Sequence, residues 1–101
     1  MPTLIFTYSP KEGVSLESLK KFLDEVDQPA TLSLPSTISA RILKVLDADT
    51  TFRCIELLEI TSFEDWERDT KVPSPELQVV LDEWPKYGKM DEMKIYQCED
   101  L

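Results

Sequence analysis

The fold prediction for this chain depends most on the stretch Phe52–Ile60, FRCIELLEI, because both of its faces carry large apolar side chains. With the two-residue period of a β-strand, one face includes Glu56 and Leu58 and the other includes Ile55 and Leu57. A strand that turns one face to water alternates apolar and polar residues instead. This strand therefore predicts a sheet that is covered on both sides.

The segments on either side of this strand predict the element order β-α-β-β-α-β. Apolar residues at helical spacing, with serines at capping positions, indicate helices. Short runs of β-forming residues indicate strands. We expect strands at 4–9, 38–46, 51–60 and 90–98, and helices at 15–26, from Ser62, and from Ser74 to Pro85. Residues 28–37 are expected to form a linker, and Asp47–Thr50 a hairpin loop.

This order, in a chain of 101 residues, predicts one α+β domain spanning residues 1–101. The expected fold is a ferredoxin-like βαββαβ plait, a four-stranded antiparallel sheet with its helices on one face. The other face is bare in a monomer, and an apolar face of that size marks an interaction surface. A second copy of the chain is the simplest cover, so we expect a homodimer, a dimeric α+β barrel with a cavity between its two sheets.

Composition excludes several classes of partner. Twenty acidic residues against eleven basic ones give a net charge of −9, which opposes binding to nucleic acid and to anionic membranes. No stretch approaches the ~20 apolar residues that span a bilayer. No basic segment precedes the short apolar run near the start, so no secretory signal is expected, and two cysteines make no disulfide framework. We expect a cytoplasmic protein.

The chain contains no histidine and only two glycines. The first absence removes the commonest metal ligand, haem ligand and general base. The second, with no GxGxxG, GxxxxGK[ST] or CxxC motif, leaves no glycine-rich phosphate loop and no paired-cysteine site. We therefore expect neither a metal nor a cofactor.

The strand register decides which polar residues reach the cavity between the sheets. If Asp47–Thr50 is a four-residue loop, Arg41 lies opposite Glu56, and opposed residues point to the same side of a sheet. The dimer face would then hold Arg41, Leu43, Val45, Phe52, Cys54, Glu56 and Leu58, and the helix face Ala40, Ile42, Ile55 and Leu57. A loop one residue longer or shorter would move Arg41 to the other side.

Glu56 with Arg41 is the best candidate for a catalytic pair, because a carboxylate in an apolar cavity can act as a base or as a hydrogen-bonding anchor. A structural ion pair at the dimer seam is the alternative. Tyr8, Tyr96 and Cys54 complete the candidate ligand-binding residues. The tyrosines would hydrogen-bond a ligand from the cavity wall, or they are ordinary half-buried strand residues. Cys54 would contact the ligand, or it is a small buried hydrophobic residue of the core.

Four segments resemble the REDY-like family of prodigiosin-type pigment biosynthesis. They are MPTLIFTYSPKEGVSLESLKKFLDEV at the start, SARILKV in the second strand, and EITSFEDWERD and PELQVVLDEW in the second half. The resemblance implies a dimeric α+β barrel in a bacterial tripyrrole pathway, acting near its bipyrrole branch. It carries over no functional residue, because the family offers no short catalytic signature. The wider group of such barrels includes haem-degrading enzymes and others with a cavity histidine, which this chain lacks.

Three functions follow as expectations. The first is binding or processing of an apolar aromatic or pyrrole intermediate, with proton transfer or cofactor-free oxygen insertion if the protein is an enzyme. The second is a non-catalytic scaffold or chaperone-like dimer that assists pathway enzymes. The third is a cofactor-independent monooxygenase of another pathway.

Overall fold

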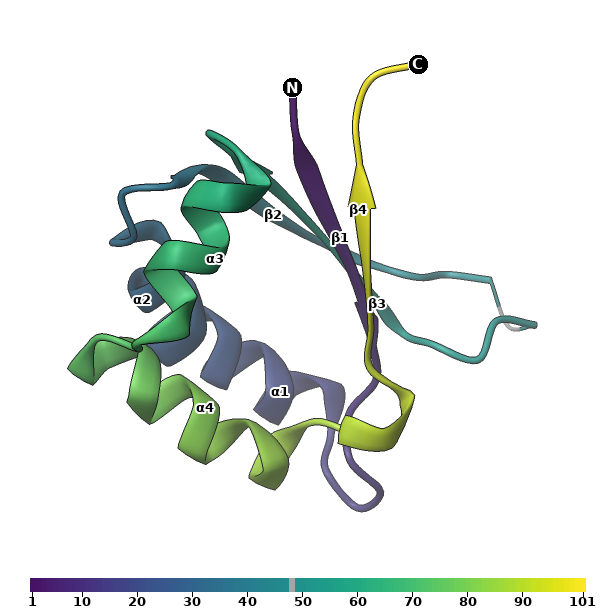
Figure 1. The fold of residues 1–101 in the computed structure, drawn as a ribbon. Helices are drawn as coiled ribbons and strands as arrows, with labels where there is room; N and C mark the ends of the chain where they lie inside the picture. Colours follow the sequence, from purple (N-terminus) through teal and green to yellow (C-terminus); the bar gives the residue numbers. More distant parts are fainter. Residues whose placement is uncertain (48) are drawn as a thin grey trace.

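A computed structural model describes residues 1–47 and 49–101 and shows a four-stranded antiparallel sheet (Figure 1). In space the strands run in the order β2-β3-β1-β4, so the first and third strands lie in the middle. Their bounds are β1 Thr3–Tyr8, β2 Thr37–Lys44, β3 Cys54–Ile60 and β4 Lys94–Cys98. This order and the antiparallel pairing confirm the ferredoxin-like plait.

The helices all lie on one side of the sheet (Figure 1). Their bounds are α1 Leu16–Phe22, the π-helical turn η1 Leu23–Asp27, α2 Gln28–Leu32, α3 Phe63–Lys71, α4 Pro75–Tyr87 and the 3-10 turn η2 Met90–Glu92. The expected serine caps are present: the side chains of Ser15, Ser62 and Ser74 each accept a hydrogen bond from the backbone N–H three residues on. No helix of the described residues is long and apolar enough to cross a membrane.

Two helix bounds differ from the expectation. Residues 28–37 are not wholly a linker, because Gln28–Leu32 continues the first helix as α2. Pro29 is the second residue of this segment and directly follows the junction with the π-helical turn η1. Pro85 does not end the last helix either: α4 runs on to Tyr87, and the N–H of Gly88 still donates to the carbonyl of Trp84.

The register between β2 and β3 corrects the predicted site. Arg41 lies opposite Leu57, and Ile42 lies opposite Glu56, one position away from the prediction. The prediction assumed a loop of four residues at Asp47–Thr50. Instead, the strands end at Lys44 and begin again at Cys54, which leaves a long connection, of which Ala48 lies outside the described residues.

The one-residue offset reverses the two faces of β3 but not those of β2. Cys54, Glu56 and Leu58 face the helices and are buried, whereas Ile55 and Leu57 lie on the open face and are half-buried. The predicted ion pair between Arg41 and Glu56 therefore does not form, since their side chains point to opposite sides of the sheet. The predicted sides of Ala40, Ile42, Arg41 and Leu43 were right.

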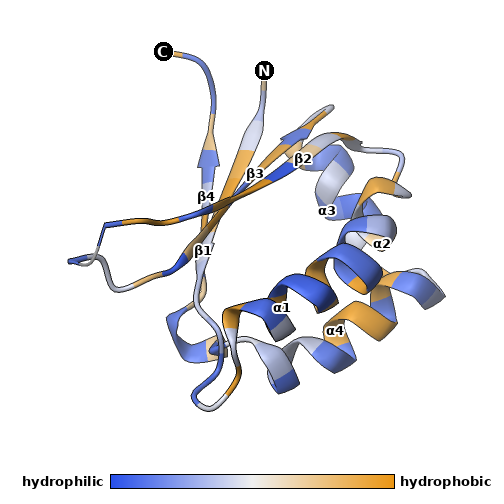
Figure 2. Ribbon diagram, turned by 180° about the vertical axis from the view of Figure 1, so that it is seen from behind, coloured by the Kyte–Doolittle hydropathy of each residue, from blue (hydrophilic) through white to orange (hydrophobic). Residues whose placement is uncertain are grey.

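The hydrophobic core fills the space between the sheet and the helices. Figure 2 shows apolar residues along the sheet and hydrophilic residues over much of α1. The most completely buried large side chains include Tyr8, Leu19, Leu58 and Ile60. Trp84 joins this core from α4 with its ring edge-on to Tyr8, at 4.9 Å between ring centroids. This packing fixes one wall of the pocket described next.

Candidate active site

A pocket of about 250 Å³ lies inside the protomer, between the helix-covered face of the sheet and helices α3 and α4. Its walls are largely apolar and include three aromatic rings: Phe6 from β1, Trp66 from α3 and Trp84 from α4. Among the described residues, the charged side chains that line it are Glu56 and Asp27, and both are acidic. An apolar pocket with a few convergent polar groups is the usual form of a small-molecule site.

Glu56 reaches this pocket from the middle of β3 and is only 4% exposed. Its Oε1 accepts a hydrogen bond of 3.1 Å from the hydroxyl of Tyr8 on β1, which lies diagonally across from Glu56, since Phe6 is directly opposite. Burial, with a smaller contribution from the nearby Asp27 carboxylate, raises the pKa of Glu56 to about 7. Burial also keeps the pKa of Tyr8 well above its usual value, so Tyr8 remains a hydrogen-bond donor.

Asp27 is the second acid of the pocket, and the sequence analysis did not single it out. It ends the π-helical turn η1 and is 5% exposed. Its Oδ1 accepts a hydrogen bond from the indole Nε1 of Trp84 at 3.4 Å, and its Oδ2 accepts one from the amide of Gln28 at 3.3 Å. Burial raises its pKa, although these two hydrogen bonds oppose the rise. One signal was available: Asp27 is four residues beyond Leu23, on the apolar stripe of the helix.

The five predicted site residues are divided between the two faces of the sheet. Tyr8, Cys54 and Glu56 lie under the helices, whereas Arg41 and Tyr96 lie on the open face. Tyr96 is opposite Ile5 and is 47% exposed. The structure thus brings Tyr8 and Glu56 into contact and separates both from Arg41 and Tyr96.

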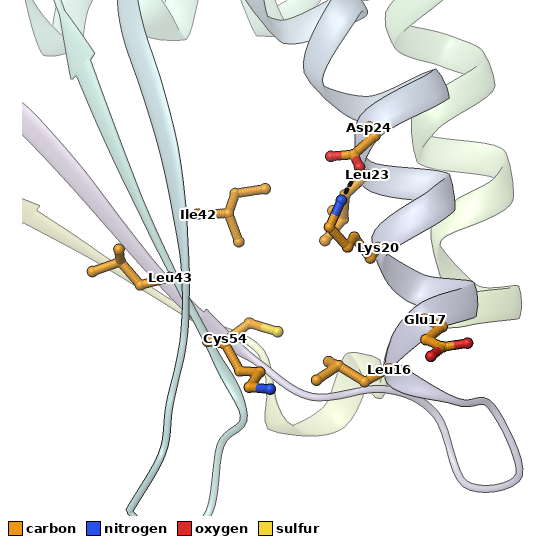
Figure 3. Close-up of a pocket in the computed structure, with 9 residues that line it drawn as sticks. Leu16, Glu17, Lys20, Leu23, Asp24, Ile42, Leu43 and Cys54 are labelled. Carbon is orange, nitrogen blue, oxygen red and sulfur yellow. Dashed lines mark hydrogen bonds and ion pairs between the residues drawn. The ribbon is translucent and has the colours of Figure 1, made fainter.

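A second hollow of about 360 Å³ lies between α1 and the edge strand β2 (Figure 3). Leu16, Ile42 and Cys54 point into it, whereas Leu43 points away. Its acidic groups are Glu17 on α1 and Asp24 on η1, and Asp24 forms an exposed ion pair with Lys20 of α1. Such a pair is solvated and weak. Burial raises the pKa of the Cys54 thiol, which keeps it neutral, so this hollow offers mainly apolar contact. The chemistry of the molecule is concentrated in the pocket that holds Glu56.

The arrangement around Glu56 is suited to proton exchange and to hydrogen bonding with a flat ligand. A carboxyl group whose pKa lies near neutrality can give or take a proton at physiological pH. The aromatic walls can stack on a ring. Among the described residues, no group of three or more metal-ligating side chains lies close enough together to hold a metal ion.

Fold and site together define a ferredoxin-like α+β protein with an acidic, largely apolar pocket between sheet and helices. Residues 2–101 match the family of the REDY-like protein HapK. The chain therefore belongs to this REDY-like HapK family, as the resemblance indicated. No curated protein matches the sequence.

Several solved structures share the fold of this chain. HapK from Hahella chejuensis superposes with a TM-score of 0.80 at 16% identity, over 100% of this chain and 93% of that one. SnoaB from Streptomyces nogalater, a cofactor-independent oxygenase, gives 0.75 at 7% identity, covering 99% and 92%. A dimeric ferredoxin-like protein of unknown function from Bacteroides fragilis gives 0.70 at 10%, covering 98% and 95%. At these identities the likeness concerns the fold alone.

Proposed function

We propose that this protein binds an apolar aromatic intermediate of prodigiosin-type pigment biosynthesis, with pyrrole N–H groups, in the pocket that holds Glu56. The observation that carries the proposal is the combination of three aromatic walls with two buried carboxylates. A pyrrole ring would stack on the aromatic walls, and its N–H would donate a hydrogen bond to one of the acids. Membership of the REDY-like HapK family supports the pathway. The site is thus inside each protomer and not between two sheets.

Both tryptophans of the chain line this pocket, which makes intrinsic fluorescence a direct measure of occupancy. Titration with a 2,2′-bipyrrole-5-carbaldehyde is expected to quench this fluorescence to saturation. The variant Thr70→Phe places a ring in the pocket from the half-buried wall of α3, and we expect it to weaken binding about tenfold or more.

Val79→Phe is the matched control, because Val79 is 50% exposed on α4 and lies outside this pocket. It should bind the aldehyde as the parent protein does. Absence of quenching up to the solubility limit of the aldehyde would contradict the binding function. That result, together with unchanged pigment output from Thr70→Phe cells, would favour the scaffold for pathway enzymes. Oxygen consumption with the bound aromatic would instead indicate a cofactor-independent monooxygenase.

The proposal includes a homodimer formed through the open face of the sheet. Ile5, Leu43, Ile55 and Leu57 form an apolar strip on this face, and each is half-buried in the single chain. Tyr96 extends the strip onto β4. A second copy would remove these side chains from water, and the dimeric Bacteroides fragilis protein provides a precedent within the same fold.

Replacing Leu57 by Glu tests this interface. Two copies of a new carboxylate would be buried near the centre of the apposed sheets without a partner, at a cost of several kcal/mol. We expect sedimentation at micromolar concentration to change from a dimer to a monomer. Val72→Glu is the control: it makes the same chemical change at a residue that is 80% exposed next to α3, and it should remain dimeric. A parent protein that sediments as a monomer would refute the dimer.

A further inference from the structure

Glu56 and Asp27 form an acid pair that lacks a positive partner. Glu56 accepts from the hydroxyl of Tyr8, and Asp27 accepts from Trp84 and Gln28, so every donor on the pair is neutral. Among the described residues, no lysine or arginine forms an ion pair with either acid. A buried charge is normally paired, because its removal from water is costly.

The described groups that surround Glu56 supply no positive charge, so a bound proton is what neutralises the acid pair. Tyr8 faces it from β1, Asp27 from η1, and Cys54 from its own strand. The residues of α3, α4, η2 and β4 that line the pocket carry no ionisable side chain. Two carboxylates in one apolar site share a proton more readily than they both ionise. The pair is therefore a proton store that faces the ligand pocket.

We propose that the pocket binds its ligand as a cation, and that the Glu56–Asp27 pair supplies the proton. The ligand class is a conjugated heteroaromatic with a basic ring nitrogen of the imine type beside a pyrrole N–H. On binding, the O–H bond of the carboxyl group breaks and an N–H bond forms on the ligand. The carboxylate and the new cation remain together as an ion pair, and no oxidant or reductant takes part.

The walls of the pocket favour the same charge. Phe6, Trp66 and Trp84 present aromatic rings to the ligand, and the face of an aromatic ring attracts a cation. A carboxylate accepts shorter and stronger hydrogen bonds from a charged N–H than from a neutral one. The protonated ligand takes the place of the shared proton, so its positive charge lies against both acids, whereas a neutral pyrrole brings no positive charge into the pocket. This inference rests on the proposed binding function and adds the charge state of the ligand to it.

The test uses a 2,2′-dipyrromethene as the probe, because its visible absorption band moves when the imine nitrogen is protonated. The pH titration of the probe is recorded alone and with saturating protein. We expect its apparent pKa to rise by about one unit or more on binding, which equals a tenfold preference for the cation. The double variant Glu56→Gln, Asp27→Asn should abolish this rise.

The control for the double variant is Glu59→Gln with Asp82→Asn, which changes the net charge equally at residues outside the pocket. It should retain the full rise in the pKa of the probe. If the double variant does not fold by circular dichroism, Glu56→Gln alone decides the matter, because its amide oxygen still accepts from Tyr8. We expect it to reduce the rise to less than half of the parental value.

The outcomes separate the two proposals. A probe that binds the parent protein with an unchanged or lowered pKa would overturn the cation inference and leave the binding function standing. An equal rise in the parent protein and the double variant, or in Glu56→Gln where the double does not fold, would overturn the assignment to the acid pair. Failure of both the probe and the bipyrrole aldehyde to bind would remove the binding function and the inference together.

Discussion

Gly88→Ala is expected to destabilise the protein by about 3 kcal/mol, although it adds one methyl group. A Cβ at this position would overlap Cζ3 and Cε3 of Trp84, far inside van der Waals contact. The indole cannot move aside easily, because it packs edge-on against Tyr8 and Phe22 and donates to Asp27. Denaturant unfolding followed by circular dichroism measures the loss.

A double-mutant cycle identifies the cause. In a Trp84→Leu background the obstructing ring atoms are gone, so adding Gly88→Ala should cost well under 1 kcal/mol. Gly13→Ala offers a second comparison. Its φ of +84° makes a side chain strained, by roughly 1–2 kcal/mol, although nothing lies within 4 Å of the new methyl. Equal costs for Gly88→Ala in the two backgrounds would show that the indole is not responsible.

Glu56→Gln is expected to stabilise the protein at pH 8 by about 2–3 kcal/mol and to have little effect at pH 4. The pKa of Glu56 is raised from 4.5 to about 7 in the folded state, so the folded protein binds this proton more tightly than the unfolded chain does. The stability that the proton confers is complete below pH 4.5 and is lost as the pH rises through about 7. Glutamine is neutral at every pH and avoids this loss.

The measurement is the free energy of unfolding at pH 4, 6 and 8 for both proteins. Glu67→Gln is the control, since Glu67 is exposed on α3 and its replacement should not alter the pH profile. Parallel profiles for the parent protein and Glu56→Gln would contradict a buried, protonated carboxyl group. The same variant is expected to lose more than half of the preference for the protonated ligand, so Glu56 lowers the stability of the protein while it contributes to binding.

Much of the fold was accessible from the sequence because local signals agree with one another. Ser15, Ser62 and Ser74 cap helices at the expected positions, and the apolar stripes of α1 and α4 fix which sides turn inward. The order of elements then leaves few topologies, and the antiparallel plait is the one observed.

The candidate site was predicted less well because β3 is apolar on both faces. A pattern with one polar face would have fixed its register, whereas the faces of Glu56 and Leu57 could not be distinguished in this way. The choice then depended on the length of the loop after β2, which the prediction made too short. The β2 faces were right because Arg41 and Ile42 differ clearly in polarity. The free-energy cost of burying a carboxyl group argues against placing Glu56 in the core. The hydrogen bond from the hydroxyl of Tyr8 offsets part of this cost.

The wide turn η1 has an evolutionary consequence. Its backbone bonds span five residues, as when one residue is inserted into an α-helix, and such insertions recur at functional sites. Deleting a single codon within Leu23–Asp27 would restore ordinary helical geometry and rotate the aspartate about 100° away from the pocket. One small genetic event thus separates a protein with two acids from a protein with one. Related sequences should accordingly differ in length by one residue at this turn where the second acid is absent.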